Sequence, residues 1–101
     1  MSTKYPLEER TVSFSENIIL FLKKIKTSTI NTAIIGQLIR TATSIGANYM
    51  EANNASSKKD FQNKIFICKK EAQETKYWLR LLITVEPACK EECLVMIDEV
   101  Q

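Results

Sequence analysis

Hydrophobic positions recur at helical spacing through most of the chain, and the repeat is most regular between residues 57 and 85. Because side chains spaced alternately by four and three residues share one helix face, this stretch predicts a long helix with one apolar seam. Glu86-Pro87 should end it, since proline disfavours helical geometry in the residue before it. The seam consists of Phe61, Ile65, Cys68, Ala72, Thr75, Leu79 and Leu82.

Three further helices are predicted, over residues of about 13–26, 30–53 and 88–101. Ser13 and Glu16 have the spacing of a capping box at the start of the first helix. The turn at 54–57 offers Ser57 as an N-cap, and the last helix is short or truncated. We therefore predict an all-α fold, an antiparallel up-down-up-down four-helix bundle that forms a single domain over residues 1–101. The apolar stripe of the first helix consists of Phe14, Ile18, Phe21, Leu22 and Ile25, and the last helix carries the apolar residues Leu94, Val95, Ile97 and Val100.

A polar strip accompanies the apolar face of the second helix, within the run QLIRTATSIGANYMEA. Its main members, Arg40, Ser44, Asn48 and Glu51, are spaced by 4, 4 and 3 residues and so share one edge of the helix. Helical geometry leaves two interpretations equally open, a solvated face or a second packing surface against another subunit. Small residues nearby would permit close helix approach in the second case: Ala42, Gly46 and Ala47.

Charged residues of the third helix fall into two groups. Glu71 and Glu74 flank the apolar seam, and we expect partly buried pairing with Arg40 or with a lysine rather than acid–base catalysis. Four cations cluster on the outer face, which is either an ordinary solvated surface or a stripe that follows nucleic-acid phosphates. These cations are Lys58, Lys69, Lys76 and Arg80. Tyr77 and Trp78 are expected to pack inside the protein or at an interface rather than to stack on a ligand.

Composition is that of an ordinary globular domain, with 101 residues, 45% apolar and 26% charged. No apolar run approaches the roughly 20 residues that span a bilayer, and the polar N-terminus does not resemble a signal peptide. Three cysteines without framework spacing favour reduced thiols, so a cytoplasmic location without a membrane contact is expected. Residues 57–85 carry a net charge of +4 and residues 86–101 one of −4, which fits self-association as well as binding of a polyanion.

Motifs for catalysis, metals and cofactors are missing from the sequence. The chain has no histidine, the commonest general base and a usual zinc ligand. Cys89 and Cys93 lie one helical turn apart without a second ligand pair, and Cys68 belongs to the apolar seam. Both glycines lie inside a predicted helix, so no glycine-rich phosphate loop is present. We expect no enzyme activity, no metal and no cofactor.

The run from Gln37 to Leu79 resembles the bacterial four-helix-bundle family whose founding members are encoded by intervening sequences within 23S ribosomal RNA genes. Gly46 stands where proline is common in that family, and Asn53-Asn54 replaces a frequent glycine. The matching positions are Gln37, Leu38, Arg40, Ser44, Ile45, Ala47, Asn48, Glu51, Ser57, Asp60, Phe61 and Glu74.

The resemblance implies a bundle that assembles into a ring, with a pentamer as the expected size. Similar bundles accompany reverse transcriptases and bind both nucleic acid and the polymerase. We therefore expect a non-enzymatic homo-oligomeric interaction module, and a further protein partner is left open. The alternative is an RNA- or DNA-binding accessory protein that assists a reverse transcriptase or a ribosomal RNA process. The first hypothesis assigns interface or structural roles to Arg40, Ser44, Asn48, Glu51, Glu71 and Glu74, and the second assigns phosphate contacts to Lys58, Lys69, Lys76 and Arg80.

Overall fold

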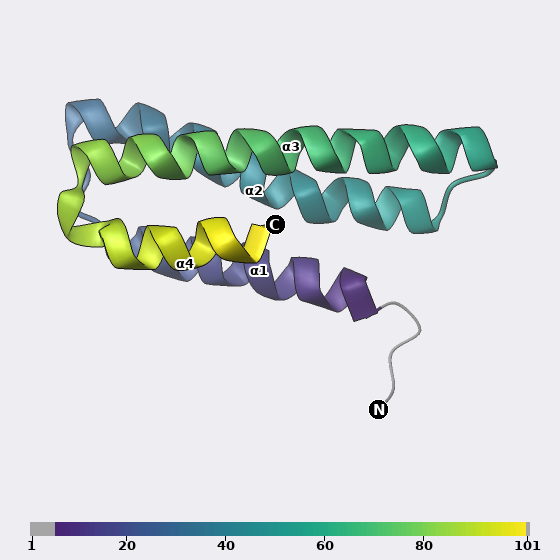
Figure 1. Cartoon of the computed structure of the whole chain (residues 1–101), viewed down its shortest axis with the longest axis horizontal. Helices are drawn as coiled ribbons and strands as arrows, with labels where there is room; N and C mark the ends of the chain where they lie inside the picture. The colour runs from purple at the N-terminus through teal and green to yellow at the C-terminus, as the bar shows by residue number, and fades with distance from the viewer. Residues whose placement is uncertain (1–5, 101) are drawn as a thin grey trace.

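Four antiparallel α-helices make up the computed structural model, which describes residues 6–100 (Figure 1). They are α1 (Pro6–Lys23), α2 (Thr29–Asn53), α3 (Lys58–Val85) and α4 (Lys90–Val100), and a 3₁₀ turn, η1 (Pro87–Cys89), precedes the last. No strand occurs among the described residues. The predicted all-α up-down-up-down bundle with a short fourth helix is confirmed.

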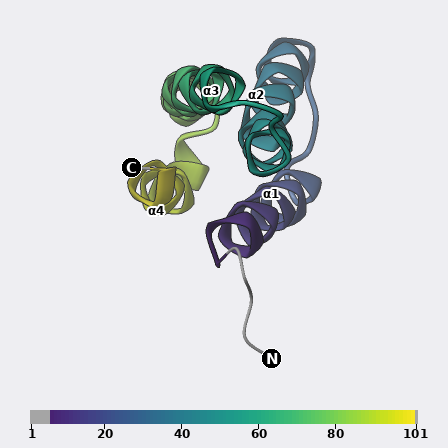
Figure 2. The ribbon, with the colours of Figure 1, turned by 90° about the vertical axis from the view of Figure 1, so that its right-hand side faces the viewer.

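The α2–α3 hairpin forms the most extensive helix–helix contact of the bundle. Seen end-on, the four helices occupy the corners of a quadrilateral, in which α1 packs mainly on α2 and α4 mainly on α3 (Figure 2). The loop end of the hairpin extends beyond both α1 and α4 (Figure 1). Phe61 lies in this extension and is exposed, although the apolar pattern predicts it in the seam. The seam is buried further along, at Cys68, Thr75, Leu79 and Leu82.

The core lies at the end of the bundle where all four helices overlap. Its buried members come from every helix and are Phe14, Ile18, Phe21, Leu22, Leu38, Ala42, Leu79, Leu82 and Cys93. Burying a large aliphatic or aromatic side chain contributes about 1.5–3 kcal/mol, so this cluster is the main source of stability. The predicted inward positions of the first helix agree with it, and Ile25 packs against the same cluster from beyond the end of α1.

The first helix begins earlier than the capping-box pattern predicts. It starts at Pro6, so Ser13 and Glu16 lie in its interior and are exposed rather than capping. Proline suits a first helical turn, and the two acidic residues of that turn favour the positive end of the helix dipole. A capping box does form at α2, where Asn31 N donates to Ser28 Oγ and Ser28 N donates to Asn31 Oδ1.

Only half of the apolar residues named for the fourth helix, Ile97 and Val100, pack against the core. Leu94 and Val95 are exposed, while Cys93 is fully buried against the core. Burial raises the pKa of the Cys93 thiol to about 12, so this residue is a neutral packing group. Because α4 packs mainly on α3, it buries one narrow stripe at helical spacing, formed by Cys93, Met96, Ile97 and Val100.

One hydrogen-bond cluster joins the α1–α2 loop to the end of α3. The fully buried Asn31 side chain donates through Nδ2 to Glu86 Oε2 at 2.7 Å and to the Lys26 carbonyl at 3.1 Å. Its Oδ1 accepts from Ser28 N at 2.7 Å. Because Glu86 is also the C-cap residue of α3, the cluster fixes the corner where the chain turns into α4.

Replacing Asn31 with alanine should therefore destabilise the fold. The change removes three side-chain hydrogen bonds and deprives Glu86 of its donor, and we expect a loss of about 2–4 kcal/mol in the free energy of unfolding. Urea denaturation measures it. Asn17→Ala, an exposed position in α1, is the matched control and should change stability by less than about 0.5 kcal/mol. Equal effects of the two substitutions would contradict this role of Asn31.

Candidate functional site

Arg40 connects α2 to α3 along the polar strip of α2. Its Nη2 lies 3.3 Å from Glu74 Oε1 and its Nη1 lies 3.7 Å from Glu71 Oε1. Its Nε donates to Gln37 Oε1 at 3.3 Å, which holds the guanidinium from its own helix. The Arg40 side chain nevertheless remains 53% exposed. The structure thus pairs Arg40 with both glutamates that flank the seam, while much of the guanidinium still faces outward.

Glu71 is the unusual member of this group, because it is a carboxylate at only 7% exposure. The 3.7 Å contact with Arg40 is too long for a hydrogen bond, and no group within residues 6–100 donates one to Glu71 Oε1. A buried carboxylate oxygen without a donor is costly, so such groups are rare. Beneath it, the buried hydroxyls of Thr41 and Thr75 lie 3.1 Å apart across the α2–α3 interface.

The rest of the polar strip bonds mostly within the protein. Ser44 donates to the Arg40 carbonyl at 2.7 Å, and Asn48 donates to the Ser44 carbonyl at 2.9 Å. Glu51 reaches α3, where its Oε1 lies 2.7 Å from Lys64 Nζ and raises the pKa of that lysine, chiefly through the hydrogen bond between them. Of the four strip residues, Arg40 and Glu51 therefore connect the two helices, whereas Ser44 and Asn48 bond to the backbone of α2.

Small residues on α2 have two different surroundings. A Cβ atom at Gly46 would lie 3.2 Å from Thr11 Oγ1, so this glycine lets α1 approach α2 within the subunit. The sequence-based expectation that Gly46 permits approach by another subunit is therefore wrong. Gly36 differs, since a Cβ there would meet nothing within 4 Å among the described residues. Exposed Ala33 and Ala47 lie on the same side of the helix, within about 60° of Gly36 at 100° per residue.

The outer face of α3 carries the predicted cations, and exposed aromatic rings lie among them. Lys58, Lys69 and Arg80 are exposed, and Lys76 is half-buried. Phe66 is 69% exposed and Tyr77 55% exposed, so of the two expected environments for Tyr77, the interior of the subunit or an interface, the interior is excluded. Trp78 does pack partly against the core.

We define the outer stripe as the positions of α3 within an arc of about 120° around this face. All of α3 is described, and the stripe contains six Lys or Arg and no Asp or Glu. An angular count of the sequence would have found the two aromatics, because Phe66 and Tyr77 lie only about 20° apart around the helix. The stripe consists of Lys58, Lys59, Gln62, Phe66, Lys69, Lys70, Gln73, Lys76, Tyr77, Arg80 and Thr84.

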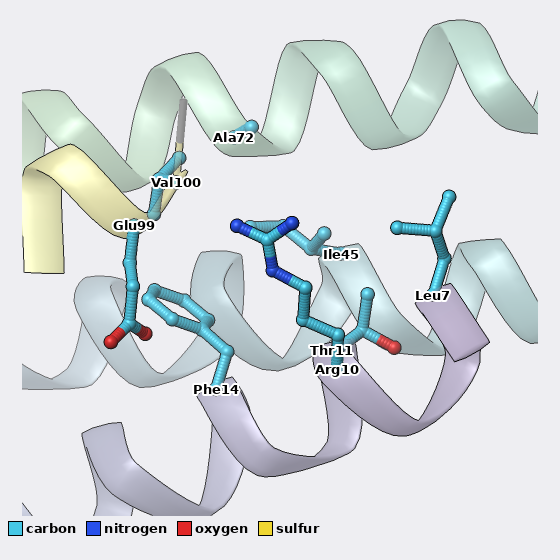
Figure 3. A pocket seen from close by; sticks show the side chains of 8 residues that line it. All are labelled: Leu7, Arg10, Thr11, Phe14, Ile45, Ala72, Glu99 and Val100. Carbon is cyan, nitrogen blue, oxygen red and sulfur yellow. The ribbon is translucent and has the colours of Figure 1, made fainter.

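Two hollows adjoin α4. A groove of about 600 Å³ between α3 and α4 lies beside Tyr77, and its lining consists of Gln73, Lys76, Tyr77, Arg80, Leu81, Thr84 and Ile97. A second hollow of about 200 Å³ lies where α4 ends and α1 faces α3, and Figure 3 shows the Arg10 guanidinium reaching toward Ile45 and Ala72. The remaining lining of this second hollow is Leu7, Thr11, Phe14, Glu99 and Val100.

Reactive groups do not converge anywhere in the described part of the chain. No cluster of three His, Cys, Asp or Glu side chains there could hold a metal ion. The three cysteines are free, and burial raises the pKa of each thiol, which lowers its reactivity. None of the helices within residues 6–100 has the length and hydropathy needed to cross a bilayer.

Comparison with known proteins decides the family. Residues 5–101 match the family model described as 23S rRNA-intervening sequence protein. The chain belongs to this family. A crystal structure of a protein of unknown function from the S23 ribosomal protein family, from Bacteroides thetaiotaomicron, is similar to it at a TM-score of 0.78 and 34% identity. The match covers 92% of this chain and 86% of that one. No curated protein matches the chain.

Membership of the 23S rRNA-intervening sequence protein family accounts for the bundle, and the solved relative carries no assigned function. The family assignment agrees with the resemblance in the run from Gln37 to Leu79, which contains both the Arg40 strip and most of the outer stripe. What these two surfaces do has to be argued from their own chemistry.

Removing the Arg40 side chain should destabilise the subunit by leaving Glu71 without a nearby cation. Because Arg40 is half exposed, we expect Arg40→Ala to cost about 1–2 kcal/mol, less than the loss of a fully buried partner. Adding Glu71→Gln, which removes the charge, should restore part of the loss. Urea denaturation of the four members of this double-mutant cycle measures the coupling.

The control for this cycle is Lys64→Ala, which breaks the more exposed pair with Glu51 and should destabilise the protein less than Arg40→Ala does. A loss at Arg40 that Glu71→Gln does not reduce would show that the two side chains are not coupled.

Proposed function

We propose that this protein is a non-enzymatic interaction module that assembles with copies of itself through the outer face of α2 around Gly36 and Arg40. A glycine inside a helix costs about 1 kcal/mol relative to alanine. Gly36 has no contact among the described residues that would require the absence of a side chain. Close approach by a helix of a second subunit would supply such a reason. The glycine at position 36, which no contact within the subunit explains, is the observation that carries the proposal.

The surroundings of Gly36 support the same contact. Ala33 and Ala47 are also exposed on this side of α2, and neither side chain would hold a neighbouring helix at a distance. Arg40 lies between them with half of its side chain accessible.

The family resemblance adds the expected form of the assembly. The resemblance implies a ring, and a pentamer of 11.6 kDa subunits would have a mass of about 58 kDa.

A cytoplasmic location is part of the same proposal, because three free cysteines are typical of a reducing compartment. The absence of an enzyme activity is likewise proposed, from the lack of converging reactive groups in the described residues.

Gly36→Met tests the assembly directly. Methionine is a better helix former than glycine, so the subunit should keep its helical fold, while the added side chain should block close approach. We expect light scattering to give an oligomeric mass for the wild type and a much smaller mass for the variant, with an unchanged circular dichroism spectrum. Ser13→Met, on the exposed face of α1, is the control and should keep the wild-type mass. A monomeric wild type, or an oligomeric Gly36→Met variant, would contradict the proposal.

A second candidate function, binding of RNA or DNA, is favoured by the outer stripe of α3. Six cations without a carboxylate make this helix face positively charged. The surface is suited to phosphates, which lysine binds as a point charge and arginine as a two-pronged donor. It contains all four cations that the sequence analysis assigned to phosphate contacts, and Lys76 and Arg80 also line the α3–α4 groove.

Binding through the outer stripe should depend strongly on salt. Lys69→Gln combined with Arg80→Gln should weaken binding of single-stranded RNA and reduce the slope of log K against log salt by about 1.4, if each residue contacts one phosphate. Fluorescence anisotropy across a salt series measures both quantities. Lys23→Gln combined with Lys24→Gln removes the same charge at the end of α1 and should leave the slope unchanged. Equal slopes for the two double variants would refute binding through the stripe.

A further inference from the structure

We propose that the outer stripe of α3 binds single-stranded nucleic acid, with unpaired bases stacking on Phe66 and Tyr77 and one base entering the groove beside Tyr77. The inference rests on the second candidate function and specifies its ligand. It is independent of the surface around Gly36.

The shape of the stripe favours a single strand over a duplex. From Lys58 to Thr84 the stripe follows a straight helix for about 39 Å, at 1.5 Å per residue. A flexible single strand can follow such a line and bring successive phosphates to the cations. In a duplex each backbone winds around the axis, so a straight row of lysines meets only part of it. A flexible single strand can therefore contact more of the cations than a duplex can.

The two exposed rings, Phe66 and Tyr77, offer surfaces on which unpaired bases can stack. A large apolar ring is usually buried, yet Phe66 projects from a surface whose neighbours along the helix are polar or positively charged. Every nucleobase has a π face, so stacking on an aromatic side chain is strong and nearly independent of sequence. In a duplex those faces are already occupied by neighbouring bases. Exposed aromatics within a positive stripe thus match single strands specifically.

The surroundings of Phe66 argue against a protein partner. An anchor for a protein usually lies in a contiguous apolar patch. The residues three and four positions away from Phe66 are instead Gln62, Asn63, Lys69 and Lys70. Hydrophobic contact with a partner protein would bury these polar groups, whereas a stacked base leaves them free to bind the adjoining phosphates.

The spacing of the rings defines the footprint. Phe66 and Tyr77 are separated by eleven residues, or about 16 Å along the axis. Bases stacked in one strand rise by about 3.4 Å each, so the two rings would contact bases about five positions apart in a stacked strand. Fewer nucleotides separate them when the strand is extended. An oligonucleotide of about ten residues covers both positions and the flanking cations.

The α3–α4 groove extends the Tyr77 position into a pocket for a base. Its volume of about 600 Å³ is ample for a nucleobase, and its lining contains two cations and no carboxylate. Leu81 and Ile97 form an apolar part, while Gln73 and Thr84 can form hydrogen bonds with the edges of a base. The Trp78 ring packs edge-to-face on Tyr77 with centroids 5.0 Å apart, which restricts the ring that stacks.

The experiment compares oligonucleotides of about ten residues, as single-stranded RNA, single-stranded DNA and the corresponding duplexes, by fluorescence anisotropy at low salt. We expect the single strands to bind at least about tenfold more tightly than the duplexes, from the loss of stacking. Phe66→Ala and Tyr77→Ala should each weaken single-strand binding by about fivefold to a hundredfold. Tyr77→Phe, which keeps the ring, should bind nearly as well as the wild type.

Phe61→Ala is the matched control, since Phe61 is also an exposed phenylalanine of α3 but lies outside the stripe, about 120° around the helix from its centre. It should leave binding unchanged. Circular dichroism and light scattering of every variant show whether the fold and the oligomeric mass are kept.

The outcomes separate this inference from the function on which it rests. If duplexes bind as tightly as single strands, and the aromatic variants bind like the wild type, the single-strand inference is wrong while nucleic-acid binding stands. If no oligonucleotide binds at low salt, both are wrong. If the aromatic substitutions change the oligomeric mass and leave binding intact, Phe66 and Tyr77 serve a protein contact and the inference is again refuted.

Discussion

The pairing of α2 with α3 is the contact on which the rest of the molecule depends. Its register is marked by polar contacts spread along the antiparallel hairpin: Arg40 with Glu74, Thr41 with Thr75, Ile45 with Cys68 and Glu51 with Lys64. An apolar seam alone tolerates slippage, whereas a displaced register would break both ion pairs and separate the two buried threonine hydroxyls. These contacts therefore select one alignment from several that the hydrophobic pattern allows.

The same hairpin separates the face that packs in the core from the two faces proposed to bind partners. The short α4 and the offset α1 cover one side of the α2–α3 layer and create the core at the end where the helices overlap (Figure 1). The outer sides of both long helices are left accessible, with small residues and Arg40 on α2 and with cations and aromatics on α3. Each long helix has one face that packs in the core and one that is accessible. The residue patterns of α2 and α3 therefore reflect packing on the first face and the chemistry of the surface on the second.

Helical periodicity was sufficient to predict α2 and α3 to within about two residues, because long amphipathic helices repeat the signal many times. It failed at the start of α1, where the local spacing of Ser13 and Glu16 imitates a cap and outweighed the proline at position 6. The hydrogen bond between Asn31 and Glu86 joins residues 55 positions apart, so no local pattern could predict it. Phe66 and Tyr77 are exposed although large aromatic rings are usually buried, so the sequence pattern favoured packing over an exposed position and did not predict the aromatic part of the stripe.

The two proposed surfaces reinforce each other physically. A single outer stripe offers six cations and two rings, which is a modest binding area for a flexible strand that loses conformational freedom when it is ordered. Assembly through α2 would place several copies of the stripe on one particle, so that a strand held by one subunit meets the next at a high effective concentration. Affinity then rises without any new contact, provided that the strand can span neighbouring stripes. Self-association and strand binding use different residues, so separate mutations should affect them. Self-association would nevertheless raise the affinity of the particle for a strand.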